Sequence, residues 1–420
     1  MVVIGAASPD DRTTGGTTMN ATTRTLIAAA LLMGIASGPA VAAHAAAPAS
    51  TSSAVSAATT APPTFSTPPD AAALEQAIAG LGARHEGATA ALVRVGGASG
   101  DWRGSSGVAD IRTGRPAIAE GRFRAGSVTK TFTSAVVLQL AAEGRLRLDG
   151  TVQEYLPGLL PASFKPVTVR QLLNYTSGIR SADSPGDTFE KAYAHRFDVE
   201  DPRALIANAV AKGPEFDPGT KQHYLNIDYT ILGVLIERAT GTSYEKAVTA
   251  RILKPLDLRD TSLPSRTRTR IPGAHNRGYQ AVPHPDGGRR LVDVSVWGSS
   301  REWAAGDLIS TTADLERFTK ALFGGRLVPK AQLEEMFTVP AVPDFETGQP
   351  AELTAGMKRF VLPGGKEAWG KTGGRHGYNT LIGGTRDLSR TLAYSVNSTD
   401  AKGRDMNKVA KAIVYAAFTK

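Results

Sequence analysis

The chain has 420 residues, of which 41% are apolar and 21% charged, so it is long enough for one large globular domain or two smaller ones. Its formal net charge is +9, but Lys and Arg are dispersed among acids and no nucleic-acid motif is present, so we expect no nucleic-acid partner. The absence of cysteine excludes disulfides, thiolate metal sites and cysteine nucleophiles.

The N-terminal segment is typical of an exported protein. Counting from Met19, which can serve as the start, Arg24 precedes an apolar run over residues 26–35. That run has the length of a signal-peptide core and is too short to span a bilayer. Small residues at the expected spacing predict cleavage after Ala42 or Ala45, and no cysteine is present there for lipid attachment. We therefore predict a secreted or extracytoplasmic protein without a stable membrane anchor.

The rest of the chain divides into a linker and one folded domain. We predict a signal peptide over 1–45, a disordered linker rich in Ala, Ser, Thr and Pro over 46–70, and a folded domain over 71–420. Periodicity and capping signals predict helices at 71–80, 130–143, 169–173, 228–240, 312–323, 329–337 and 405–418. They predict strands at 89–95, 101–111, 357–362, 378–384 and 391–397.

This order of elements predicts an α+β fold. Strands lie towards both ends of the domain and helices lie between them, which favours one antiparallel sheet built from both termini and flanked by helices. A mainly helical region, over about residues 146–300, is then inserted into that sheet domain.

The first candidate for chemistry is Ser127, at the start of a helix that is apolar around its whole circumference and therefore buried. Lys130 lies three residues later, so the two side chains share one face of the first turn. A desolvated lysine can take the proton of a serine hydroxyl, and a helix N-terminus favours developing negative charge. Alone, however, a Ser-x-x-Lys pair is more often a helix cap followed by a solvated lysine.

Two further groups of residues lie downstream. Tyr224 and Asn226, two positions apart on an irregular segment, can direct a phenol and an amide into a cleft, although such a pair is also common in ordinary loops. The stretch Lys371-Thr372-Gly373-Gly374 reads as a strand whose glycines permit close approach to a ligand or a helix.

The same stretch also matches the phosphate-loop pattern, with Gly365, four residues, and then Gly370, Lys371 and Thr372. A phosphate loop must open a helix, whereas the residues that follow are poor helix formers and lead into a strand. We therefore favour the strand. Neither a Gly-x-Ser-x-Gly elbow nor a His-Glu-x-x-His zinc motif is present, and the histidines lack metal-ligand spacing, so we expect no metal and no cofactor.

Taken together and in this order, Ser127-x-x-Lys130, Tyr224-x-Asn226 and Lys371-Thr372-Gly373 resemble the penicillin-recognising serine enzymes. That family includes DD-peptidases, class C β-lactamases and related esterases, and the resemblance covers about residues 75–420. It extends to residues 123–130, 143–149, 155–157, 169–173, 176–178, 218–219, 232–233 and 309–315. Within the family, the chain looks most like the soluble, exported D-alanyl-D-alanine carboxypeptidases.

The resemblance implies a role for each motif residue. Ser127 is then the nucleophile that forms an acyl-enzyme, and Lys130 and Tyr224 share the general base and acid work. Asn226 is expected to contact the substrate amide and to position Lys130, and Lys371 to keep the field positive beside Tyr224.

The substrate contacts follow from the same resemblance. Thr372 is expected to hold the substrate carboxylate, along the Gly373 strand, and the backbone N–H groups of Ser127 and Gly374 to form the oxyanion hole. Three departures from the family pattern bear on these roles. Many DD-peptidases have His at the position of Lys371, and a His that is frequent in the family is replaced by Tyr175 here. Gly374 stands where the DD-peptidases have a hydroxyl residue, so Lys358 or Arg359 is expected to supply the missing contact to the substrate carboxylate.

The sequence therefore predicts a serine D-alanyl-D-alanine carboxypeptidase that cleaves peptidoglycan stem peptides and is acylated by β-lactams. A class C-type β-lactamase or an esterase on the same scaffold is the alternative, and a non-catalytic binding module is disfavoured because every motif residue is present. Its partners are then a peptidoglycan peptide or a β-lactam small molecule, and we expect a monomer.

Overall fold

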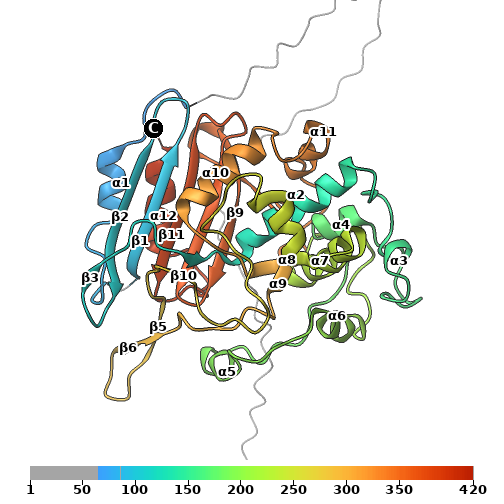
Figure 1. The fold of residues 1–420 in the computed structure, drawn as a ribbon, viewed down its shortest axis with the longest axis horizontal. Coiled ribbons are helices and arrows are strands. Elements are labelled where there is room, and N and C mark those ends of the chain that lie inside the picture. The colour runs from blue at the N-terminus through green and yellow to red at the C-terminus, as the bar shows by residue number, and fades with distance from the viewer. Residues whose placement is uncertain (1–64, 86, 420) are drawn as a thin grey trace, which may run out of the picture.

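The structure is a computed structural model that describes residues 65–85 and 87–419. Its centre is a seven-stranded antiparallel sheet with the order β3-β2-β1-β11-β10-β9-β8 (Figure 1). The strands of this sheet are β1 (Ala88–Gly96), β2 (Trp102–Asp110), β3 (Arg115–Pro116), β8 (Lys358–Val361), β9 (Glu367–Arg375), β10 (Tyr378–Gly384) and β11 (Thr391–Ser398). Strands from the N-terminal end of the domain form one side of the sheet and strands from the C-terminal end the other, joined at β1–β11, which confirms the predicted α+β fold.

The two central strands join the ends of the domain. β1 pairs antiparallel with β11, with Leu92 opposite Ser395, and nearly every residue of both strands is buried. A strand covered on both faces needs apolar or small residues throughout, which is what the run from Ala88 to Gly96 supplies. β2, nearer the edge, instead alternates exposed and covered residues over its first half.

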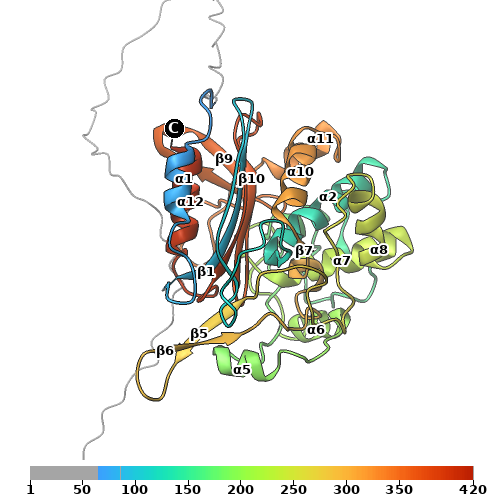
Figure 2. The ribbon, with the colours of Figure 1, turned by 60° about the vertical axis from the view of Figure 1, so that its left-hand side comes forward.

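Helices cover both faces of the sheet (Figure 2). On one face, α1 (Ala71–Ala77) and α12 (Lys408–Phe418) pack side by side and enclose a small core. Phe65 joins that core, with its ring 5.9 Å from the ring of Phe418, so packed structure is present within the last residues of the predicted 46–70 linker. The predicted signal peptide lies outside the described residues.

The other face carries a larger core shared with the helical region. There α2 (Thr129–Ala142) and α10 (Thr312–Phe323) lie between the sheet and the remaining helices. These are α3 (Val152–Tyr155), α4 (Val169–Leu173), α5 (Phe189–Ala194), α6 (Pro202–Val210), α7 (Asn226–Thr240), α8 (Tyr244–Val248), α9 (Trp303–Gly306) and α11 (Lys330–Leu333). Because α2 is enclosed on all sides, its buried residues follow one another without an exposed stripe.

Several elements differ from the sequence prediction. The predicted helix over 329–337 is divided into α11 and a 3-10 turn, Glu334–Met336, and the predicted helix from residue 405 begins at 408, where Asn407 caps it. The hairpin of β5 (Tyr279–Pro283) and β6 (Arg289–Asp293), the short pair β4 (Phe123–Arg124) and β7 (Ile309–Ser310), and helix α6 were not predicted. The hairpin sequence is rich in Arg, Pro and Gly, and its strands lack the alternation of apolar and polar residues that predicts a strand.

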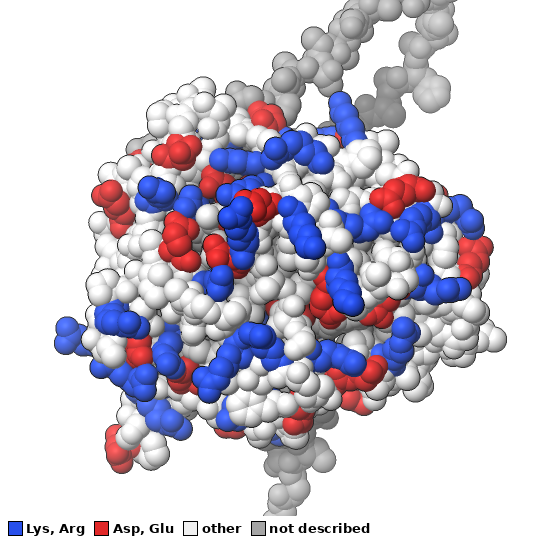
Figure 3. Space-filling view, in the orientation of Figure 1, with Lys and Arg blue, Asp and Glu red and all other residues white. Residues whose placement is uncertain are grey.

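The face seen in Figure 3 carries charges of both signs. On this face, Lys and Arg side chains are interspersed with Asp and Glu. Among the described helices, none combines the length and apolar character needed to cross a bilayer. Within residues 65–85 and 87–419, no group of three or more His, Asp or Glu side chains could hold a metal ion.

Replacing Phe132 by Ala should lower the free energy of unfolding by about 3–5 kcal/mol. Phe132 is fully buried on α2, and its ring is stacked on that of Phe318 at 3.7 Å, so truncation leaves a cavity beneath the sheet. Urea denaturation measures the change. The matched control is Tyr415→Ala on the exposed side of α12, which should cost about 0.5 kcal/mol or less, and equal losses in both variants would contradict the predicted packing.

Candidate active site

Ser127 lies in a tight turn immediately before α2. The 3-10 turn Gly126–Val128 leads directly into the helix, so the Ser127 side chain stands at its N-terminal end. Thr129 fastens the turn, because its hydroxyl donates to Gly126 O (2.7 Å) and accepts from the backbone N–H of Leu308 (3.0 Å). The turn is thereby tied to the strand pair β4–β7 as well as to α2.

Lys130, one turn further on, is fully buried. Its ammonium donates to Asn226 Oδ1 (2.7 Å) and to the backbone carbonyl of Ala305 (2.7 Å), and it lies 3.3 Å from Ser127 Oγ. Burial lowers the pKa of Lys130 to about 8, and the nearby positive charge of Lys371 acts in the same direction. A large fraction of the amine is therefore neutral at mildly alkaline pH, which is the form that can accept a proton from Ser127.

Tyr224 and Asn226 come together with this pair at the start of α7. Asn226 is the first residue of the helix, and Tyr224 precedes it on an extended segment. The Tyr224 hydroxyl is buried and makes no hydrogen bond of standard geometry within the described residues. Burial alone would raise the pKa of Tyr224, but the positive charges of Lys130 and Lys371 outweigh it and lower the pKa to about 7.

The ring of Tyr224 packs against buried Tyr175, which in turn packs against buried Tyr229. Tyr175 lies 4.9 Å from Tyr224, between ring centroids, and 5.2 Å from Tyr229. Tyr175 has a backbone φ of +63°, a conformation in which residues other than glycine are strained. Its carbonyl accepts a hydrogen bond from the N–H of His223 (2.9 Å), so the strained residue is linked directly to the segment that carries Tyr224.

β9 provides the opposite side of the site. Lys371 is buried, with its ammonium 4.7 Å from the centre of the Tyr224 ring and 3.0 Å from the carbonyl of Thr372. Gly373 is required for close approach, since a Cβ there would lie 2.0 Å from the carbonyl of Ala125. The glycine thus lets β9 lie directly against the turn that holds Ser127.

The pairing of β9 directs the backbone of Gly374 outwards. A two-residue loop joins β9 and β10, with Arg375 opposite Tyr378 and Gly374 opposite Asn379. In such a hairpin the first pair exchanges hydrogen bonds and the next does not, so Gly374 turns its N–H and C=O away from β10. The ammonium of Lys402 indeed donates to the Gly374 carbonyl (2.9 Å).

The structure brings Ser127, Lys130, Tyr224, Asn226 and Lys371 together, with the backbone of residues 372–374 alongside. Lys358 is placed differently. It is opposite Gly370 on β8, but its ammonium is held by Glu352 (2.5 Å) and lies over the ring of Phe360. The phosphate-loop alternative is excluded, because Lys371 and Thr372 lie within a strand that turns into another strand.

Two groups at the site were not singled out from the sequence. One is the Ala305 carbonyl of α9, which shares the Lys130 ammonium with Asn226, and the other is Lys402, which follows β11. A backbone carbonyl has no signature in the sequence, and Lys402 lies in an irregular loop, so neither could be found by motif. A cavity of about 260 Å³, lined in part by Tyr224 and Asn226, adjoins the cluster.

Comparison with known proteins agrees with this geometry. A family model described as "Beta-lactamase" matches residues 74–416. The chain belongs to the β-lactamase family. It is accordingly a serine hydrolase of the β-lactamase fold, and the resemblance to penicillin-recognising serine enzymes is confirmed.

Its relatives carry several different activities in their names. Penicillin-binding protein 4* of Bacillus subtilis (strain 168) is 26% identical over 308 residues, which cover 70% of this chain and 65% of that protein. Esterase EstB of Burkholderia gladioli is 32% identical over 198 residues, which cover 44% of this chain and 47% of the esterase. The matches therefore span about half to two thirds of these relatives' lengths.

A solved structure matches more completely. The crystal structure of a D-stereospecific amidohydrolase from Streptomyces sp. is 36% identical, has a TM-score of 0.71, and covers 83% of this chain and 99% of that one.

A tyrosine should titrate near neutral pH in this protein, and Tyr224→Phe should abolish that titration. Replacing Lys371 by Met removes a positive charge beside the ring, so the pKa of Tyr224 should rise by about one unit or more. Ultraviolet difference titration of tyrosinate, with Tyr224→Phe as the blank, measures both effects. Lys330→Met, at an exposed lysine of α11, is the matched control and should leave the titration unchanged; a Lys371→Met curve that coincides with it would contradict the prediction.

Proposed function

We propose that this serine hydrolase is an exported D-alanyl-D-alanine carboxypeptidase that cleaves peptidoglycan stem peptides through an acyl-enzyme on Ser127. The observation that carries the proposal is the buried cluster in which Lys130 reaches both Ser127 and Asn226 beside the Tyr224 phenol. Similarity to a D-stereospecific amidohydrolase, at 36% identity, supports an acyl donor of D configuration.

The proposed reaction is an acyl transfer in two steps. Ser127 Oγ attacks the carbonyl carbon of the scissile amide while its proton passes to the basic pair of Lys130 and Tyr224. That pair then protonates the leaving amine, the C–N bond breaks, and the acyl group remains as an ester on Ser127. Water, deprotonated by the same pair, attacks this ester and releases the acid, so the serine is regenerated. The lowered pKa values of Lys130 and Tyr224 make one proton exchangeable between them near neutral pH.

The other site residues have supporting roles in the proposal. The N–H groups of Ser127 and Gly374 stabilise the oxyanion, a contribution typically worth about 3–4 kcal/mol per donor. Asn226 orients the Lys130 amine, and Lys371 with Thr372 attracts the substrate carboxylate. Lys358 is not assigned to that carboxylate, because its ammonium is paired with Glu352.

Export is part of the proposal and rests on residues 1–45, which have the composition of a signal peptide. Peptidoglycan peptides are then accessible to the enzyme.

A D-stereospecific amidase is the second candidate, favoured by the name of the same amidohydrolase, and a free D-amino acid amide is the simplest substrate for such an enzyme. Such a substrate carries a free ammonium beside the scissile bond. Lys130, Lys371 and Lys402 surround this region with positive charge, which disfavours a cationic substrate and favours an acylated peptide. A β-lactamase or esterase differs in how readily water reaches the acyl-enzyme, so substrate turnover separates these alternatives.

Replacing Ser127 by Ala should abolish both covalent labelling by a fluorescent penicillin and release of D-alanine from a diacyl-Lys-D-Ala-D-Ala peptide. The expected loss in kcat is on the order of 10³-fold or more, because no other group can form the acyl-enzyme. Labelling is followed by gel fluorescence and mass spectrometry, and D-alanine by a coupled assay. The matched control is Ser105→Ala at an exposed position of β2, which should behave as the wild type.

Parallel assays of the wild type distinguish the candidates. Rapid nitrocefin turnover without D-alanine release would replace the carboxypeptidase by a β-lactamase. Hydrolysis of D-phenylalanine amide in preference to the peptide would favour the amidase. Undiminished penicillin labelling of Ser127→Ala would overturn the assignment of the nucleophile.

A further inference from the structure

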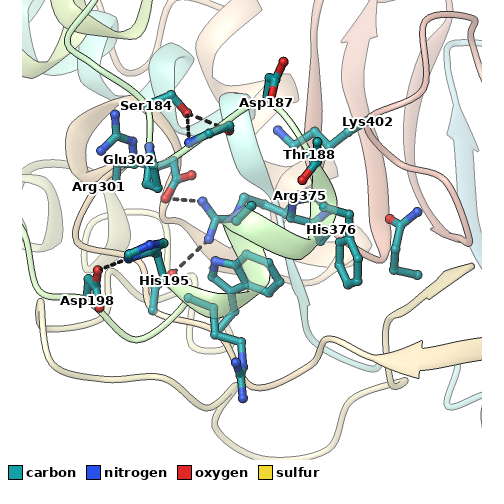
Figure 4. Close-up of a pocket in the computed structure, with 18 of the residues that line it drawn as sticks. Ser184, Asp187, Thr188, His195, Asp198, Arg301, Glu302, Arg375, His376 and Lys402 are labelled. Atoms are coloured by element: carbon teal, nitrogen blue, oxygen red, sulfur yellow. Dashed lines mark hydrogen bonds and ion pairs between the residues drawn. The ribbon is translucent and has the colours of Figure 1, made fainter. Parts of the chain in front are cut away.

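A second cavity, about 430 Å³ in volume, lies beside the C-terminal end of β9 (Figure 4). It is lined by residues 184–200 around α5, Gln280 of β5, residues 297–302, the end of β9 with the β9–β10 turn, and the loop that follows β11. Lys402 from that last loop lines the cavity and also donates to the carbonyl of Gly374. The cavity therefore begins next to the strand edge at which the oxyanion is proposed to bind.

One wall of the cavity is aromatic and uncharged. The rings of Trp297 and His376 are stacked with their centroids 4.6 Å apart, and the ring of Phe189 meets that of His376 edge to face with centroids 5.4 Å apart. Burial, reinforced by the positive charges of Lys402 and Arg375, lowers the pKa of His376 to about 3. The imidazole is therefore neutral near pH 7, and the wall offers flat surfaces to an aliphatic or peptide chain.

Most acids that line the cavity already contact basic side chains of the protein. The pairs are Glu302 with Arg375, Glu200 with Arg301, Asp198 with His195, and Asp187 with Lys191. Asp400, which also lines the cavity, is solvent-exposed. Figure 4 shows the Glu302–Arg375 contact left of the centre of the view, with Lys402 at the upper right.

Two cations of the lining are left without an acid. Lys402 forms no ion pair within the described residues, and an ammonium has three donors, of which the Gly374 carbonyl takes one. Arg196 likewise has no acidic partner there and is stacked on the rings of Tyr193 and Phe197. The cavity thus combines an uncharged aromatic wall with unpaired positive charge close to the reacting centre.

We propose that this cavity is the subsite for the acyl-donor side of the substrate, and that Lys402 makes it select a carboxylate-bearing group there. The inference rests on the proposed function, since the leaving group of a carboxypeptidase is a single amino acid, far smaller than the cavity. An acyl donor several atoms longer fills such a volume, and its carboxylate can reach the free N–H donors of Lys402. Lys402 is thereby a specificity-determining residue, distinct from the groups that move protons.

The test uses two acyl donors that differ only in charge, N-acetyl-L-glutamyl-D-alanyl and N-acetyl-L-glutaminyl-D-alanyl. Each is presented on two leaving groups, D-alanine and p-nitrophenolate. We expect the wild type to prefer the glutamyl donor by about fivefold or more in kcat/KM on both leaving groups, the effect of one partly shielded ion pair. Because the attraction is electrostatic, the preference should shrink as salt is added.

Variants of Lys402 assign the preference. Lys402→Met should bring the glutamyl-to-glutaminyl ratio to about one, Lys402→Glu should invert it, and Lys402→Arg should retain it. Using the ratio cancels any general loss that follows from releasing the Gly374 carbonyl. Lys411→Met, on the exposed side of α12, makes the same change in net charge and should leave the ratio at its wild-type value.

The two leaving groups separate the inference from the proposed function. No preference in the wild type, or a preference that survives in Lys402→Met, would overturn the assigned subsite. If neither peptide releases D-alanine while the p-nitrophenyl esters show the Lys402-dependent preference, the carboxypeptidase proposal fails. The subsite for a carboxylate-bearing acyl donor then still stands.

Discussion

The burial of Lys130 is the constraint on which the site depends. The ammonium is enclosed between α2, α7 and α9, and within the described residues no carboxylate pairs with it. A buried charge is unfavourable, and here it is offset by hydrogen bonds to Asn226 and the Ala305 carbonyl and by the Tyr224 phenol, whose pKa Lys130 lowers in turn. Burial therefore lowers the pKa of Lys130. The same dense packing that forms the core thus makes the amine able to act as a base near neutral pH.

That enclosure requires two parts of the fold to meet closely. At the junction of the Ser127 turn and β9, a Cβ on Gly126 would lie 2.8 Å from the backbone nitrogen of Gly374, and a Cβ on Gly373 would meet the carbonyl of Ala125. A larger residue at either position would separate the nucleophile from Lys371 and from the edge of the strand. The sheet and the helical region thus contribute opposite walls of one site, and their contact fixes its dimensions.

The sequence predicted the side chains of this site better than the backbone groups that surround them. Ser127, Lys130, Tyr224, Asn226 and Lys371 were identified because their order along the chain is distinctive, and the structure gathers them. The strain at Tyr175 and the carbonyl of Ala305 were not identified, because both are properties of the backbone.

The long elements followed from periodicity, since α2 and β1 are apolar in the manner that their burial demands. Helix α6 was missed although Asp201 and Pro202 supply a cap and a first-turn proline, and the β5–β6 hairpin was missed although Asp286-Gly287-Gly288 is a turn signal between its strands. Lys358 illustrates the limit of position alone, because its partner Glu352 became apparent only in three dimensions.

The order of strands in the sheet has a consequence for biogenesis. β1 lies against β11, and β9 with β10 completes the sheet beyond it, so the first strand has to wait for the last part of the chain to be synthesised. Contacts so distant along the chain form slowly, whereas the intervening helices can pack locally beforehand. Since Lys371 and Gly374 arrive with those late strands, a nascent or truncated chain holds its serine without the opposite wall of the site. Such a chain can be degraded before it is able to attack any substrate.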